Sequence, residues 1–165
     1  FVHDPNHEVA AFTEFFRAGD PGLPSERPIH QNLLISPGDP IFAESLWLPG
    51  KEAMLNFVED LETKETTHHR VRKVKGTVYD GRELDFKIER QSSFELQNFG
   101  SLRFYDAFGA VTGEGWRPLG ALEHRRRLEM QQFTAGSPTG NLMASTGNIS
   151  ANGKSFLLSW HHCHP

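Results

Sequence analysis

The sequence has a single cysteine, a small net charge and no long hydrophobic run. Cys163 has no second cysteine to pair with, so the chain cannot form an internal disulfide and a reducing compartment is favoured. Lys and Arg number 17 against 21 Asp and Glu, and the resulting charge of −4 predicts no nucleic-acid partner and no membrane partner. No stretch approaches the roughly 18 apolar residues of a membrane-spanning helix. We therefore expect a cytoplasmic protein, with a removed targeting segment as the alternative because the chain begins at Phe1.

The composition is that of an ordinary globular domain. Hydrophobic residues make up 37% of the 165 residues, charged residues 23%, and the aromatics include 13 phenylalanines. Disordered chains have few aromatics and a high net charge, so disorder is excluded. A length of 165 residues predicts one domain over residues 1–165 with its own core.

Two N-terminal segments have apolar residues at helical spacing. The first covers about residues 7–18. The second covers residues 50–62, where Ala53, Phe57 and Leu61 follow one another at intervals of four residues. The sequence therefore predicts two or three helices before the main sheet.

The later part of the chain alternates apolar and polar residues, which is typical of strands with one buried face. Asp80-Gly81 is a strong hairpin signal between two such runs. The predicted strands are residues 69–79, 83–90, 93–99 and 101–108, with a closing hairpin of 141–146 and 154–162, whereas 122–133 fits a strand or a helix. The predicted fold class is α+β, with N-terminal helices packed on a curved antiparallel sheet.

Two short motifs carry a resemblance to a known family. The run Pro49-Gly50-Lys51-Glu52-Ala53-Met54-Leu55-Asn56-Phe57 resembles the Gly-(Arg/Lys)-Glu-Ala-hydrophobic run of the NTF2-like, or SnoaL-like, superfamily. His69-Arg70-Val71, Val74 and Asp80-Gly81 resemble that family's first long strand and its hairpin. The resemblance covers about residues 7–106. The proline-rich segment 21–49 and the thirty or so residues after Phe133 depart from the family's pattern.

The resemblance implies an apolar pocket inside a cone-shaped fold. Members include polyketide cyclases, ketosteroid isomerases, scytalone-type dehydratases and non-catalytic binders. It implies a hydrophobic small molecule as ligand and general acid/base chemistry of the isomerase or lyase type that needs no cofactor. We expect no metal site, and a homodimer is the default assembly for a half-exposed sheet. The candidate catalytic residues are His69, Asp106, Tyr105 and His30, and the candidate ligand-binding residues are Trp47, Phe57, Phe86 and Phe104.

Each candidate also has a purely structural interpretation. His69 lies in a basic run that would suit a solvated strand, and Tyr105 and Asp106 begin a segment of turn composition. His30 lies in a long loop, which is either a lid over the pocket or an ordinary connection.

Two further functions stay open at this point. The same fold could serve as a non-enzymatic binding or dimerisation module. A metal-dependent hydrolase or nuclease could use the terminal cluster His161-His162-Cys163-His164, because imidazole and thiolate are good zinc and copper ligands. The chain also contains one glycosylation sequon, Asn148-Ile149-Ser150, a triplet that is common by chance.

Overall fold

The structure is a computed structural model that describes residues 2–3, 9–10, 12–14, 26–28, 33–73, 84–87, 98–111, 114–134 and 137–162. These residues form β-strands, two single turns of 3-10 helix and irregular connections, and no α-helix occurs among them. The chain divides into two compact units, Phe1–Gly81 and Arg82–Pro165, which are described separately.

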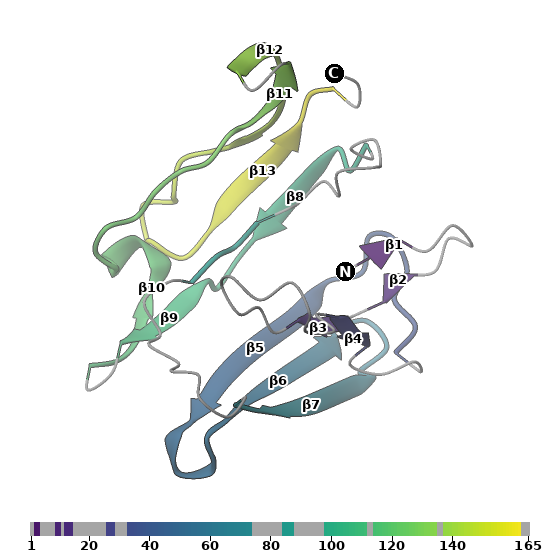
Figure 1. Cartoon of the computed structure of the whole chain (residues 1–165), viewed down its shortest axis with the longest axis vertical. Helices are drawn as coiled ribbons and strands as arrows, with labels where there is room; N and C mark the ends of the chain where they lie inside the picture. The colour runs from purple at the N-terminus through teal and green to yellow at the C-terminus, as the bar shows by residue number, and fades with distance from the viewer. Residues whose placement is uncertain are drawn as a thin grey trace. The chain divides into compact units, whose positions relative to one another are not determined.

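The first unit contains a three-stranded antiparallel sheet of order β5-β6-β7 (Figure 1). Its strands are β5 (Ile41–Leu48), β6 (Ala53–Asp60) and β7 (Thr66–Arg72). The 3-10 turn η1 (Pro49–Lys51) joins β5 to β6, and Glu52 completes the reversal with a left-handed φ of 44°.

The same unit contains two short antiparallel pairs. Strand β1 (Val2–His3) pairs with β2 (Val9–Ala10), and β3 (Phe12–Glu14) pairs with β4 (Glu26–Pro28). These pairs contribute four more strands to the N-terminal part of the chain.

The turn between β6 and β7 is built around Asp60. Its Oδ1 accepts hydrogen bonds from the backbone N–H groups of Glu62 (2.8 Å) and Thr63 (3.2 Å), which is an Asx-type turn. Burial by itself would raise the pKa of Asp60, but these backbone hydrogen bonds outweigh it and hold the pKa below the ordinary value. The turn is therefore stabilised by the ionised carboxylate.

The second unit contains a four-stranded antiparallel sheet of order β11-β12-β13-β8, in which β13 lies between β12 and β8 (Figure 1). The strands are β8 (Ser101–Phe104), β11 (Met130–Thr134), β12 (Ser137–Thr146) and β13 (Phe156–Trp160). A separate pair is formed by β9 (Phe108–Val111) and β10 (Gly115–Pro118), followed by the 3-10 turn η2 (Leu119–Ala121).

Each unit has its own hydrophobic packing. In the first unit Leu33 and Val58 are buried together, with Ile35 and Ile41 against them. In the second unit one cluster centres on Met143 and Ala144. The other centres on three buried residues with four partly buried hydrophobics around them: Ala107, Phe156 and Leu158, with Phe86, Phe99, Phe104 and Leu119.

The predicted α+β class is wrong, because the described residues of the segments expected to be helical contain strands and no α-helix. Residues 53–60 of the second expected helix form β6, and residues 9–10 and 12–14 of the first belong to β2 and β3. Strand β6 has apolar side chains on both of its faces, so its hydrophobic residues recur at spacings that a helix would also satisfy. The helix-on-sheet architecture of the NTF2-like family is therefore absent from the described part of the chain.

The strand predictions have mixed outcomes. The start of the strand predicted over 69–79 lies in β7, whereas the described residues 84–87 of the strand predicted over 83–90 are irregular. The closing hairpin is present as the antiparallel pair β12 and β13. The strand predicted over 101–108 is interrupted at 105–107, between β8 and β9, and the ambiguous segment 122–133 is irregular up to Glu129 and enters β11 at Met130. The Asp80-Gly81 hairpin and most of the 93–99 strand are not among the described residues.

The described part of the chain contains no helix with the length and apolar character needed to cross a bilayer.

Candidate functional site

The sheet β5-β6-β7 has two chemically different faces. Residues directly opposite each other in an antiparallel pair have their side chains on the same face, so the register assigns each residue to one side. We call one side the Ser45 face; it comprises Ile41, Ala43, Ser45, Trp47, Met54, Asn56, Val58, Asp60, Thr67, His69 and Val71. The opposite side, the Glu44 face, comprises Phe42, Glu44, Leu46, Leu48, Ala53, Leu55, Phe57, Glu59, Thr66, His68, Arg70 and Arg72.

The Ser45 face has a row of polar residues across all three strands. Ser45 lies opposite Asn56, and Asn56 lies opposite the half-buried His69. The Ser45 hydroxyl donates a hydrogen bond of 2.7 Å to Asn56 Oδ1. Asn56 Nδ2 and, on the same face, Thr67 Oγ1 are buried with no hydrogen-bond partner among the described residues. The core cluster of Leu33 and Val58 packs on this face, so much of it is interior.

On the Glu44 face, two carboxylates and two aromatic rings form a four-residue square. Glu44 lies opposite Phe57, and Glu59 lies opposite Phe42. The two phenylalanines occupy one diagonal and touch edge to face, with ring centroids 5.9 Å apart and planes at 60°. The two glutamates occupy the other diagonal, where the typical separation of Cα atoms is about 7–8 Å. The square therefore holds two carboxyl groups beside an apolar surface.

The burial of these glutamates distinguishes them from the others. Glu44 and Glu59 are both half-buried. The remaining glutamates whose side chains the structure describes are all exposed: Glu52, Glu62, Glu65, Glu114, Glu123 and Glu129. A carboxyl group that is partly withdrawn from water and lies next to a second one is a common arrangement for proton transfer.

The exposure of side chains in and around the square differs from strand to strand. On β5, Phe42 and Leu46 are 45% and 38% exposed, although both are large apolar side chains. On β7, the exposed His68, Arg70 and Arg72 alternate along the same face. This side of the sheet thus offers apolar contacts, cations and carboxylates within a few strand spacings.

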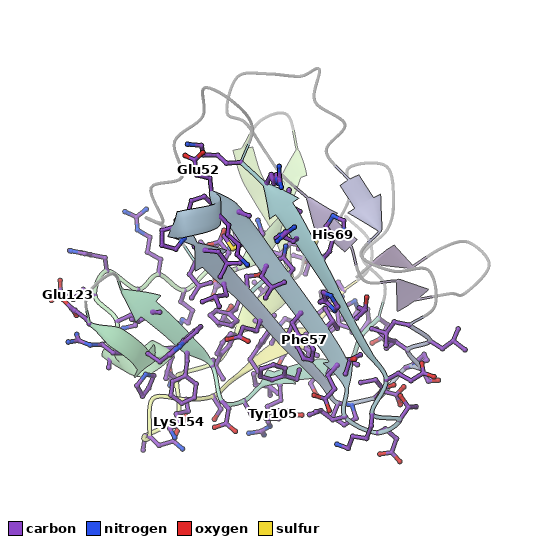
Figure 2. All side chains as sticks on the ribbon, turned by 90° about the horizontal axis from the view of Figure 1, so that it is seen from below. Glu52, Phe57, His69, Tyr105, Glu123 and Lys154 are labelled. Carbon is purple, nitrogen blue, oxygen red and sulfur yellow. The ribbon has the colours of Figure 1, made fainter. Side chains whose placement is uncertain are left out.

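The predicted catalytic residues are spread over different environments. His69 lies on β7 on the Ser45 face, away from the square that contains Phe57 (Figure 2). Tyr105 is 49% exposed, and Asp106 is exposed with a left-handed φ of 49° in the break between β8 and β9. His30 lies outside the described residues. His69 belongs to the first unit and Tyr105 and Asp106 to the second, and their catalytic roles stay predictions.

The predicted ligand-binding residues also fall into separate places. Trp47 and Phe57 lie on opposite faces of the first unit's sheet. In the second unit Phe104 stacks on Phe156 with centroids 4.9 Å apart, and Phe86 meets both rings edge to face. Phe86 and Phe104 therefore take part in packing the second unit, and ligand binding by these four residues stays a prediction.

Histidines at the end of the chain offer one polar contact. His161 Nε2 lies 2.8 Å from the hydroxyl of Ser145. Cys163 and His164 lie outside the described residues, and within those that are described no group of three or more His, Cys, Asp or Glu could hold a metal ion.

Sequence reasoning missed Glu44 and Glu59. A local signal exists, because Phe42, Glu44, Leu46 and Leu48 follow one another with a period of two residues. The diagonal placement of Glu44 and Glu59 depends on the register between β5 and β6, which the sequence does not state.

Comparison with known proteins supports the β architecture. No protein-family model matches the chain, and no curated protein matches it. Among solved structures, the crystal structure of aspergilloglutamic peptidase from Aspergillus niger is similar, with a TM-score of 0.62 and 20% sequence identity. The similarity covers 84% of this chain and 75% of that chain.

This similarity shows the fold alone, and it corrects the family expectation. The chain is rich in antiparallel sheet, like its neighbour, so the NTF2-like or SnoaL-like resemblance is wrong. The isomerase, lyase and cyclase chemistry that the resemblance implied loses its basis with it. The short motif at 49–57 that suggested the family forms η1 and the first half of β6 instead of a helix.

Proposed function

We propose that the protein hydrolyses peptide bonds and that Glu44 and Glu59 are its reacting carboxyl groups. The observation that carries the proposal is the square on the Glu44 face, where the two half-buried glutamates lie diagonally across a touching pair of phenylalanines. The likeness in fold to a protein named as a glutamic peptidase supports the choice of reaction and of residue type.

Two neighbouring carboxyl groups can divide the work of hydrolysis. An ionised carboxylate takes a proton from a water molecule, whose oxygen attacks the peptide carbonyl carbon. A protonated carboxyl group then gives its proton to the amide nitrogen as the carbon–nitrogen bond breaks. Carboxyl groups hold a proton chiefly in acidic solution. We therefore expect the rate to rise as the solution is made acidic.

The surroundings of the square suit an extended polypeptide as substrate. Phe42 and Leu46 provide exposed apolar contacts on one side of the carboxylates. His68 and Arg70 on β7 provide donors for the carbonyl oxygens of a bound chain on the other side. A segment of several residues would be needed to reach both borders, so we expect unfolded proteins to be better substrates than dipeptides.

Cleavage of an unfolded protein tests the proposal. The purified protein is incubated with a reduced, alkylated substrate from neutral to acidic pH, and the products are identified by mass spectrometry. We expect Glu44→Gln and Glu59→Gln each to lower the cleavage rate at least about a hundredfold, which is the low end of general acid/base contributions. Glu65→Gln is the matched control, because Glu65 is an exposed glutamate in the turn before β7.

The outcomes test the peptidase function and the assignment of the two glutamates separately. Absence of cleavage by the unmodified chain at every pH would refute the peptidase function. Cleavage that is equally fast in the Glu44→Gln, Glu59→Gln and Glu65→Gln variants would place the reacting groups elsewhere.

A second candidate function is binding of a polypeptide without cleavage, with this fold as a non-enzymatic module. The exposed apolar side chains of Phe42 and Leu46 favour it, because large apolar groups grouped on one face often mark a binding surface. Titration of the same unfolded protein into the chain distinguishes the two candidates. Binding that is weakened by Phe42→Ser, with an intact substrate after long incubation, would favour the module.

A further inference from the structure

We infer that Asn148 accepts an N-linked oligosaccharide when the chain is made in a secretory pathway. The acceptor is the side-chain amide of the triplet Asn148-Ile149-Ser150. This site lies in the second unit and is independent of the proposed peptidase function.

The triplet occupies the connection between β12 and β13. Strand β12 ends at Thr146, and residues 147–150 are irregular, so the backbone there is outside the sheet ladder. Asn148 is exposed. Acceptor asparagines are expected at such surface loops, because the attached sugar is bulky and must stay in solvent.

The orientation of the Asn148 amide leaves its nitrogen available. Arg127 Nη1 lies 2.8 Å from the Asn148 Oδ1 atom. A guanidinium group has only donors, so the Asn148 atom that faces it must be the oxygen. Nδ2 then lies on the other side of the amide group, and no described residue accepts a hydrogen bond from it. Because the sugar is attached to Nδ2 and the amide oxygen remains an acceptor, the Arg127 contact is compatible with glycosylation.

The Ser150 hydroxyl shapes the rest of the loop. Its Oγ donates to Asn152 Oδ1 (2.7 Å) and accepts from the backbone N–H of Ser155 (2.9 Å). The N–H of Gly153 donates to the carbonyl of Ser150, which closes a tight turn. The folded loop is thus held by residues 150–155 and leaves Asn148 to one side of the turn.

The transfer of the oligosaccharide to Asn148 requires a lipid-linked donor. The oligosaccharide is supplied as a polyprenyl-pyrophosphate ester. The bond between its anomeric carbon and the pyrophosphate oxygen breaks, and a bond from that carbon to Asn148 Nδ2 forms. One proton leaves Nδ2, and the lipid pyrophosphate is the leaving group.

Secretion from a eukaryotic cell tests the inference. The full chain is expressed behind a signal sequence and ahead of a C-terminal Asn-Gly-Thr extension, which is an acceptor that reports passage through the pathway. Intact mass is then measured before and after digestion with a peptide N-glycosidase. We expect two oligosaccharides on the wild-type chain and on Ser150→Thr, and one on Asn148→Gln and on Ser150→Ala.

Comparison of the two Ser150 variants separates acceptor chemistry from loop structure. Threonine keeps the acceptor triplet, whereas alanine abolishes it. A wild-type chain that carries a sugar only on the extension would overturn the inference, because the chain would have met the transferase and Asn148 would have been passed over.

Discussion

At the scale of single residues, the charge of Asp60 stabilises the turn between β6 and β7. The residue is 0% exposed, yet its carboxylate accepts two backbone hydrogen bonds in the turn between β6 and β7. Burial opposes the ionised form and the N–H donors favour it, and the net effect lowers the pKa. The ionised side chain is therefore part of what holds the turn.

The lowered pKa of Asp60 predicts a loss of stability in acid. A group whose pKa is lower in the folded state stabilises the fold above its unfolded pKa, and this contribution disappears as the pH falls through the folded value. We expect the free energy of unfolding to fall on acidification below about pH 4, the ordinary pKa of aspartate. In Asp60→Asn the fall should be shallower, as measured by urea denaturation at a series of pH values. If Asp60→Asn had the same pH dependence as the unmodified chain, Asp60 would not contribute to the loss of stability in acid.

At the scale of single elements, β13 and β6 differ in how clearly the sequence pattern predicts each of them as a strand. In β13 the buried Phe156 and Leu158 alternate with half-buried residues, and the sequence pattern 154–162 was recognisable as a strand. In β6 the alternation of burial is carried partly by Asn56 and Asp60, which are polar. Both faces of β6 carry apolar side chains, and the face with Val58 also buries two polar residues, so a pattern based on hydrophobicity does not show the period of a strand.

The role of β13 in the second unit predicts a large cost for losing its central ring. Phe156 is 6% exposed and is stacked on Phe104. We expect Phe156→Ala to lower the free energy of unfolding by about 3–5 kcal/mol, the usual range for a buried phenylalanine. Phe42→Ala, at a ring that is 45% exposed, should cost clearly less. Equal costs in urea denaturation would contradict this assignment of the core.

At the scale of the whole molecule, the described chain is an assembly of antiparallel sheets in two units. Most of its hydrogen bonds between strands join segments that are near in sequence, as in β5-β6-β7, but β8 pairs with β13 across some fifty residues of chain. The predicted single domain over residues 1–165 stays a prediction.

The absence of described α-helix predicts a simple spectroscopic result. The far-ultraviolet circular dichroism of the full chain should have the single minimum of β-sheet, because strands account for most of the regular structure described. A helical double minimum would contradict the architecture and restore the α+β alternative. Unfolding in urea provides the control spectrum.

Local sequence was sufficient for the features that depend on neighbours along the chain. The closing hairpin of β12 and β13 follows from alternation over a few residues, and the lack of an internal disulfide follows from the single Cys163. The segment 50–62 could not be assigned in this way, because apolar residues on both faces of a strand satisfy the helical and the extended period together. Contact between Phe42 and Phe57, and the diagonal placement of Glu44 and Glu59 in the square, require the register of two strands. Register is a property of the folded sheet, since a shift of one residue would move every one of these side chains to the other face.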